Sequence, residues 1–123
     1  MKIETITANV SLKGPNMVVV KYKPDARVGL KELLAIHEAE KKLTNEKKHL
    51  ALLDARGFIY MSPEAKKFGA SEKPGKYRKA AALLVDSLGV KILGNFYLNF
   101  NKPVVPTKMF SSEKKAIEWL MKQ

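Results

Sequence analysis

Apolar and polar residues alternate near the start of the chain. Four apolar residues with polar neighbours show the two-residue period of a strand with one buried face: Ile6, Ala8, Val10 and Leu12. Residues 13–16 then supply turn chemistry, and residues 17–23 form a second apolar segment. We therefore predict an amino-terminal hairpin.

A helix and a buried strand follow this hairpin. Over residues 29–43, apolar side chains recur at intervals of three and four with charged residues largely opposite, which predicts an amphipathic helix. Residues 50–53 are a short, unbroken apolar run that ends at Asp54. Such a run favours a strand covered on both faces in a parallel sheet, and helix-covered strands imply crossover connections.

Ser62 marks the start of a second helix. Its side chain can cap a free amide, Pro63 suits the first helical position, and Glu64 places an acid in the first turn. We predict a short helix over residues 63–68. The polar residues 69–79 that follow are expected to form a mobile surface loop.

The carboxyl-terminal part of the chain predicts two strands and two helices. Residues 80–85 are unbroken apolar and precede a cap signal, which favours a buried strand although alanine favours helices. Residues 88–100 fit both a helical and an alternating template. Residues 106–110 resemble a strand, and joining them in parallel to residues 80–85 requires a crossover, so we predict a helix over 88–100. Ser111 and Ser112 then cap a final helix.

The resulting order is β-β-α-β-α-β-α-β-α, an α/β fold with a mixed, mostly parallel sheet. A length of 123 residues predicts a single domain, residues 1–123, and 46% hydrophobic with 28% charged residues is ordinary for a globular protein. The chain has no cysteine, which suits a reducing cytoplasm, and we expect it to be cytoplasmic. No export signal or apolar run of about 20 residues is found, so no transmembrane segment is expected.

The formal net charge of +11 raises the prior for anionic partners: nucleic acid, anionic lipid or an acidic protein face. A solvated surface explains the dispersed lysines equally well. The tightest basic cluster surrounds Pro74 and Gly75, and its candidate anion-binding residues are Lys76, Arg78 and Lys79.

Chemical signatures of an enzyme are missing from the sequence. The glycines form no P-loop or dinucleotide fingerprint, and no G-x-S-x-G elbow occurs. His37 shares a helical face with Leu30 and Leu33, so we expect a packed residue, and His49 is expected to be exposed to solvent. We predict no catalytic residue, no metal site and no cofactor.

The carboxyl ends of the buried strands are the place to seek a site, because ligands of open α/β sheets bind there. This edge holds the candidate partner or phosphorylation residues Asp54, Arg56, Tyr60 and Ser62. Two interpretations stay open. Asp54 and Arg56 pair with each other or with loop amides while Ser62 only caps its helix, or Ser62 is an anion-binding or phosphorylatable point at a positive helix end.

The order of elements resembles the STAS domain, typified by bacterial anti-sigma-factor antagonists. A bacterial family of small, stand-alone STAS-like proteins is similar in three stretches, HLALLDARGFIYMSPEAKKF, AALLVDSLGVKILGNFYLNFNKPVVPTKMF and SSEKKAIEWL. The resemblance implies a SpoIIAA-like sandwich. In the typical antagonist, a phosphorylatable serine sits in an aspartate-serine-x-glycine stretch where the second helix begins; Ser62 is the nearest equivalent, without that aspartate or glycine.

Three functional hypotheses follow. The leading one is a non-enzymatic regulatory or protein-interaction module with a protein partner. The second is binding of an anionic surface, nucleic acid or phospholipid, through a basic face. The third is carriage of a small apolar ligand, with a pocket lined by Phe96, Tyr97, Phe100 and Trp119. The exposed edge of the amino-terminal hairpin is also a candidate contact for a homodimer.

Overall fold

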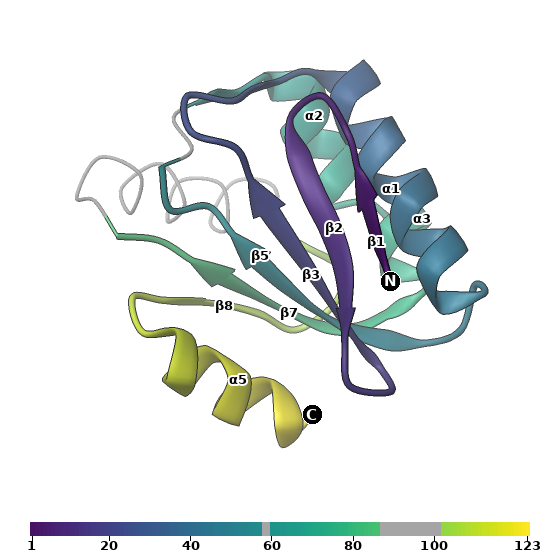
Figure 1. Cartoon of the computed structure of the whole chain (residues 1–123), viewed down its shortest axis with the longest axis vertical. Helices are drawn as coiled ribbons and strands as arrows, with labels where there is room; N and C mark the ends of the chain where they lie inside the picture. Colours follow the sequence, from purple (N-terminus) through teal and green to yellow (C-terminus); the bar gives the residue numbers. More distant parts are fainter. Residues whose placement is uncertain (58–59, 87–101) are drawn as a thin grey trace.

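A mixed six-stranded sheet forms the centre of the protein (Figure 1). The structure is a computed structural model that describes residues 1–57, 60–86 and 102–123. The first three strands in the order β1-β2-β3-β5-β7-β8 are antiparallel, and β3, β5, β7 and β8 run parallel. The strands are β1 (Lys2–Glu4), β2 (Ala8–Lys13), β3 (Met17–Tyr22), β5 (His49–Asp54), β7 (Arg78–Leu84) and β8 (Thr107–Phe110). The predicted mixed α/β sheet is confirmed.

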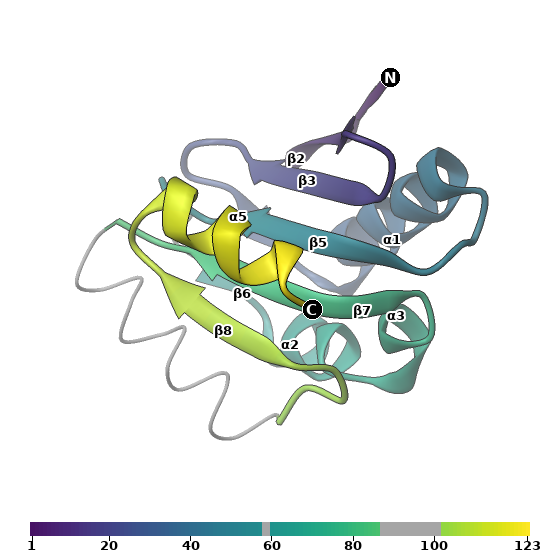
Figure 2. The same ribbon diagram turned by 90° about the horizontal axis from the view of Figure 1, so that it is seen from below.

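Helices cover both faces of the sheet, as Figures 1 and 2 show. On one face lie α1 (Leu30–Thr44), α2 (Pro63–Gly69) and the short α3 (Glu72–Gly75). On the other lies α5 (Glu113–Met121). Each face has its own core, the first centred on buried residues such as Val10, Val20 and Ile36 and the second on Leu52 and Leu120. Successive side chains of a strand point to opposite faces of the sheet, and here each face carries a core. This explains why β5 and β7 contain apolar runs without polar interruptions.

The amino-terminal hairpin is confirmed, with Lys13 opposite Met17 across its turn. The predicted strand through Ile6 is wrong, however, because Ile6 lies in a bend and is 84% exposed. Thr5 makes this bend: its backbone amide donates to the Ala8 carbonyl at 2.8 Å, and its Oγ1 accepts from the Ala8 amide at 3.0 Å. The residues before the bend form β1, which covers the edge of the hairpin that was expected to be exposed.

The helices α2 and α5 begin at the capping residues predicted from the sequence. Ser62 Oγ accepts a hydrogen bond from the Ala65 amide at 3.1 Å and begins α2, and Ser112 Oγ accepts from the Lys115 amide at 3.3 Å and begins α5. At the start of α1, the Gly29 amide donates to Glu32 Oε1 at 2.8 Å. These bonds satisfy amides that the first turn of a helix leaves without a partner.

Two parts of the chain differ from the sequence-based expectation. A two-stranded parallel ladder, β4 (Arg27–Val28) with β6 (Tyr60–Met61), was not predicted. Residues 69–79, expected to be a mobile loop, contain α3 and the first residues of β7. The strand begins early because its first residue is held by the buried contacts described below. The predicted helix over 88–100, with Phe96, Tyr97 and Phe100, lies outside the described residues.

Trp119 belongs to the core between α5 and the sheet, where its ring lies 5.7 Å from that of Phe110. Within the described ranges, no helix has both the length and the apolar character needed to cross a bilayer.

Candidate functional site

Asp54 and Arg56 form a compact ion pair at the carboxyl end of β5. Asp54 is the last residue of the strand and is buried. The Arg56 guanidinium donates through Nε to Oδ1 at 3.0 Å and through Nη2 to Oδ2 at 2.8 Å, and the Arg56 amide also donates to Oδ1 at 3.1 Å. Both oxygens of the carboxylate are therefore engaged in a bidentate contact that fixes the turn after the strand.

Arg56 also reaches the first turn of α5. Its Nη2 donates to Glu113 Oε1 at 3.0 Å, so one guanidinium joins the end of β5 to a helix on the α5 face. The hydrogen bond to Asp54, reinforced by the charges of Asp54 and Glu113, raises the pKa of Arg56 above its ordinary value. The side chain stays 37% exposed, so this permanent cation remains accessible from solvent.

Tyr60 and Ser62 lie on the opposite side of the same edge, where β6 leads into α2. The Tyr60 side chain is exposed, and the Arg27 guanidinium stands 5.7 Å from its ring centroid, a cation–π distance. The Ser62 amide donates to the Val28 carbonyl at 2.9 Å, which attaches the start of α2 to β4. Of the four predicted site residues, the structure thus joins Asp54 with Arg56, whereas Tyr60 and Ser62 contact β4 and α2 instead.

A buried ionic cluster at the other end of the strands was missed by sequence reasoning. Glu40, on α1, accepts hydrogen bonds from Arg78 through Oε1 at 2.6 Å and through Oε2 at 2.8 Å. His49 Nε2 lies 2.6 Å from the same Oε2, and its Nδ1 lies 2.9 Å from the Lys47 carbonyl. Burial by itself raises the pKa of Glu40, but the charge and hydrogen bonds of Arg78 and His49 outweigh it and lower that pKa to about 2.

A β-bulge makes this cluster possible. His49 pairs with Arg78 and Leu50 with Ala80, so Lys79 is an extra residue on β7. Ala80 faces the α5 core, and in a regular strand Arg78 would face the same way. The extra residue turns Arg78 toward α1, where Glu40 lies.

Two predictions are corrected by this cluster. His49, expected to be exposed, is 1% exposed and held by Glu40. Arg78, a candidate anion-binding residue, is buried with its guanidinium against Glu40, so the structure does not place it on the surface with Lys76 and Lys79, which are both exposed. One signal was available in the sequence: Glu40 lies four residues after Ile36 on the apolar stripe of its helix, where a carboxylate requires a cation.

His37 is packed, as predicted. Its ring lies 5.5 Å from that of Phe68 in an edge-to-face arrangement and 6.3 Å from that of Tyr77. Burial lowers its pKa, which favours the neutral imidazole in this half-buried position.

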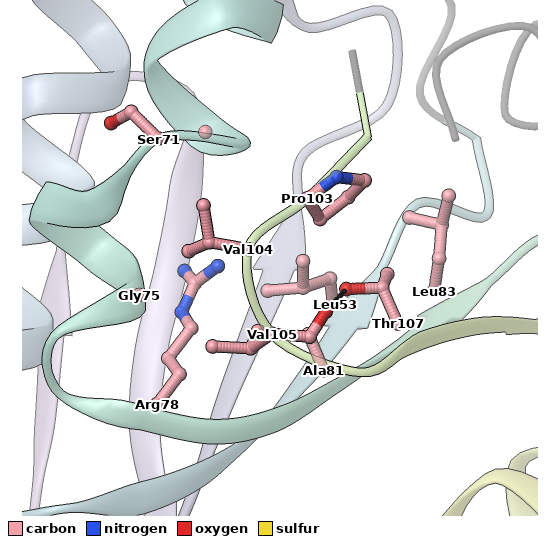
Figure 3. A pocket seen from close by; sticks show the side chains of 11 residues that line it. Leu53, Ser71, Gly75, Arg78, Ala81, Leu83, Pro103, Val104, Val105 and Thr107 are labelled. Carbon is pink, nitrogen blue, oxygen red and sulfur yellow. Dashed lines mark hydrogen bonds between the residues drawn. The ribbon is translucent and has the colours of Figure 1, made fainter. Parts of the chain in front are cut away.

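A small pocket lies between the α2–α3 turn, β7 and residues 103–107 (Figure 3). Its free volume is about 30 Å³, and its walls are mostly aliphatic, with Leu53, Val104 and Val105 among them. The polar atoms around it are engaged elsewhere: Thr107 Oγ1 donates to the Val105 carbonyl and Ser71 Oγ to the Phe68 carbonyl. Trp119, predicted to line an apolar pocket, lies on the opposite face of the sheet. In residues 1–57, 60–86 and 102–123, no three His, Cys, Asp or Glu side chains converge as a metal site requires.

The strand order and the helices on both faces define a SpoIIAA-like α/β sandwich, the fold that the resemblance implied. A crystal structure of an uncharacterized protein of the DUF3478 family with a SpoIIAA-like fold, from Shewanella loihica PV-4, is similar with a TM-score of 0.64 at 16% identity, over 96% of this chain and 98% of that one. A protein with unknown function from Arthrobacter sp. FB24 matches with a TM-score of 0.34 at 23% identity, over 93% and 99%.

Family membership follows from the sequence itself. Residues 11–123 match the family described as Domain of unknown function (DUF7793), and the chain belongs to this family. No curated protein matches the sequence. The similarity to the Shewanella protein, at 16% identity, shows the fold alone.

Proposed function

We propose that this chain is a non-enzymatic regulatory module that binds another protein at the carboxyl edge of its sheet, on the side of α1 and α2. The observation that carries the proposal is a group of exposed apolar side chains around Ser62. Leu30, Leu34 and Tyr60 are 39%, 40% and 43% exposed, and Arg27 stands over the Tyr60 ring. Tyrosine and arginine are the residue types enriched at the centres of protein interfaces.

The backbone brings these side chains to one place. Arg27 and Tyr60 are paired residues of the β4–β6 ladder, and Ser62 bonds to Val28 of the same ladder. α1 begins two residues after Val28, so Leu30 starts the helix at this edge and Leu34 follows one turn later. Because the ladder and both helix starts are hydrogen-bonded, a partner would meet a preorganised surface, which lowers the entropy cost of binding.

The polar groups at this edge are engaged in structural hydrogen bonds, which supports a role in binding rather than in catalysis. The Ser62 hydroxyl accepts the Ala65 amide as a helix cap, and both carboxylate oxygens of Asp54 are taken up by Arg56. A phosphate on Ser62 would add a charge of about −2 at the positive end of α2, next to the exposed tyrosine. Ser62 is therefore the proposed regulatory point of the surface.

The test is quantitative capture of partners from native lysate of the source cell, followed by mass spectrometry. Tyr60→Ala and Leu34→Ser should each reduce recovery of a specific partner about tenfold or more, the loss expected for hot-spot residues. Met121→Ser is the matched control, since Met121 is an exposed apolar residue of α5 on the other face. Ser62→Asp keeps a capping side chain and adds charge, so it tests the switch without removing the cap.

A substitution at Arg56 tests whether the interface extends to the α5 side of the edge. If the partner also covers the α5 side of the edge, Arg56→Ala weakens capture, whereas Lys48→Ala, which removes a positive charge before the amino end of β5, leaves it unchanged. Recovery of the same proteins at the same level by wild type, Tyr60→Ala and Leu34→Ser would refute the proposed surface.

A further inference from the structure

The amino ends of the parallel strands form a second edge, where lysines are frequent. The Leu50 amide donates to the Asn16 carbonyl at 2.8 Å, which places the β2–β3 turn beside the start of β5. The His49 amide donates to the Tyr77 carbonyl at 2.9 Å, which places the α3–β7 turn on its other side. Figure 2 shows these turns and the α1–β5 connection together at the end of the sheet from which the parallel strands start. We call residues 13–16, 38–49 and 72–79 the basic edge.

The buried cluster fixes the lysine-bearing segments of this edge relative to one another. Glu40 comes from α1, His49 from the start of β5 and Arg78 from the start of β7, and each is buried. Lysines flank every member of the cluster, within two residues along the chain: Lys41 and Lys42 beside Glu40, Lys47 and Lys48 beside His49, Lys76 and Lys79 beside Arg78. The bulge that turns Arg78 inward leaves Lys79 exposed. The buried cluster thus fixes the relative positions of the three segments that carry the exposed lysines.

The charge of the basic edge is strongly one-sided. Its three segments carry three exposed acids, Glu38, Glu46 and Glu72, and eight lysines, namely Lys13, Lys41, Lys42, Lys47, Lys48, Lys73, Lys76 and Lys79. Glu38 neutralises Lys41 at 3.0 Å. In the part of the chain that the structure describes, no salt bridge involves the other seven lysines. The excess of lysines over exposed acids in these segments favours an anionic counter-surface.

The side chains of the edge suit phospholipid headgroups better than nucleic acid. Its exposed cations are all lysines, which act as point charges, whereas bidentate contacts to guanine need arginine or a similarly placed pair of donors. The one aromatic residue in these segments, Tyr77, is half-buried, donates its hydroxyl to Glu46 at 3.0 Å and has the Lys76 ammonium 5.4 Å from its ring, so it offers no free platform for a base.

An exposed aliphatic side chain lies beside Gly75, the residue before Lys76. Val104 is 55% exposed, its amide donates to the Ala70 carbonyl at 3.2 Å, and it packs where Gly75 lacks a side chain. We infer that the basic edge binds the anionic surface of a phospholipid bilayer, with the lysines at the headgroups and Val104 entering the interface. Peripheral binding of this kind combines charge attraction with shallow apolar burial.

Flotation with lipid vesicles tests the inference directly. The full chain should bind vesicles of phosphatidylcholine mixed with phosphatidylglycerol, ignore pure phosphatidylcholine, and lose affinity as salt is added. Each lysine near the surface contributes about fivefold, so Lys47→Gln with Lys48→Gln should weaken binding on the order of tenfold or more. Val104→Ser should weaken it further without any change in charge.

Lys114→Gln with Lys115→Gln is the matched control. It removes the same two charges from α5, close to Glu113 and thus at the opposite edge, and should change binding by no more than about twofold. Equal losses for both pairs would mean that only net charge matters and would refute the site. Tighter, lysine-dependent binding of duplex DNA than of anionic vesicles would assign the edge to nucleic acid instead. Neither result would argue against the protein-binding surface proposed at the carboxyl edge.

Discussion

The two ends of the parallel strands carry the same chemical group, an arginine held by a carboxylate, in different surroundings. At the amino ends, the side chains of Arg78 and Glu40 are 10% and 3% exposed. At the carboxyl ends, those of Arg56 and Asp54 are 37% and 6% exposed. The first pair is enclosed by α1 and the sheet, whereas the second can still be touched from outside. Burial therefore separates an ion pair that organises the fold from one that can also contribute to a surface.

The largest effect is expected from breaking the buried pair. Glu40→Leu should lower the free energy of unfolding by about 3–5 kcal/mol, because the buried Arg78 guanidinium would lose the carboxylate that accepts two of its hydrogen bonds. Urea unfolding measures the change. Glu38→Leu is the matched control, two residues earlier on α1, where an exposed contact with Lys41 is lost and little change is expected. Equal destabilisation by both variants would contradict the role given to the cluster.

Acid should reveal the same cluster in the unmodified chain. The folded-state pKa of Glu40, about 2, lies below its ordinary value of 4.5, so the stabilisation from Glu40 is complete above about pH 4.5 and is lost as the pH falls toward 2. The loss is on the order of 3 kcal/mol for this group. Unfolding free energies measured across this range should fall less steeply in Glu40→Leu than in the unmodified chain. Parallel slopes would assign the acid sensitivity to other carboxylates.

Breaking the ion pair at the carboxyl edge should lower the free energy of unfolding by less. Arg56→Ala leaves Asp54 with the hydrogen bond from the backbone amide of residue 56, and water can occupy the space vacated by the guanidinium. We expect a loss of about 1–2 kcal/mol in unfolding free energy. Glu113→Gln removes only the negative charge from the outer, exposed contact of Arg56 and should change stability by about 0.5 kcal/mol or less. A loss for Arg56→Ala as large as that for Glu40→Leu would show that the two pairs do not differ in the way their burial suggests.

Local patterns predicted the parts of the fold whose causes are local. The hairpin, α1 and the cores of β5 and β7 follow from periodicity and apolar runs, and the starts of α2 and α5 follow from Ser62 and Ser112. The β4–β6 ladder has only two residues on each strand, too few for any period to appear. β1 depends on a bend made by one threonine side chain.

The pairing of Asp54 with Arg56 was one of the two interpretations that the sequence offered, whereas the pairing of Arg78 with Glu40 was missed. Asp54 and Arg56 are two residues apart, so their pairing is visible in the sequence. Arg78 and Glu40 are 38 residues apart, and their contact depends on a bulge that changes which face Arg78 occupies. A one-residue irregularity of this kind reverses the direction of a side chain while leaving the apolar pattern of the strand intact.

The smallest effect concerns Ser62, whose helix cap can be compared with that of Ser112 on the other face of the same carboxyl edge. Ser62→Ala removes the acceptor of the Ala65 amide and should lower stability by about 1 kcal/mol, whereas Ser62→Asp restores an acceptor and places a negative charge at the positive end of α2, so it should stay close to wild type in thermal unfolding. Ser112→Ala serves as the reference, because its bond to Lys115 is longer, 3.3 Å, and a smaller loss is expected. An Asp variant that is as stable as wild type yet fails to capture the partner would separate the structural role of this hydroxyl from its regulatory role. An Asp variant as unstable as Ser62→Ala would instead mean that α2 does not tolerate a charge at its cap, and that Ser62 cannot be the switch.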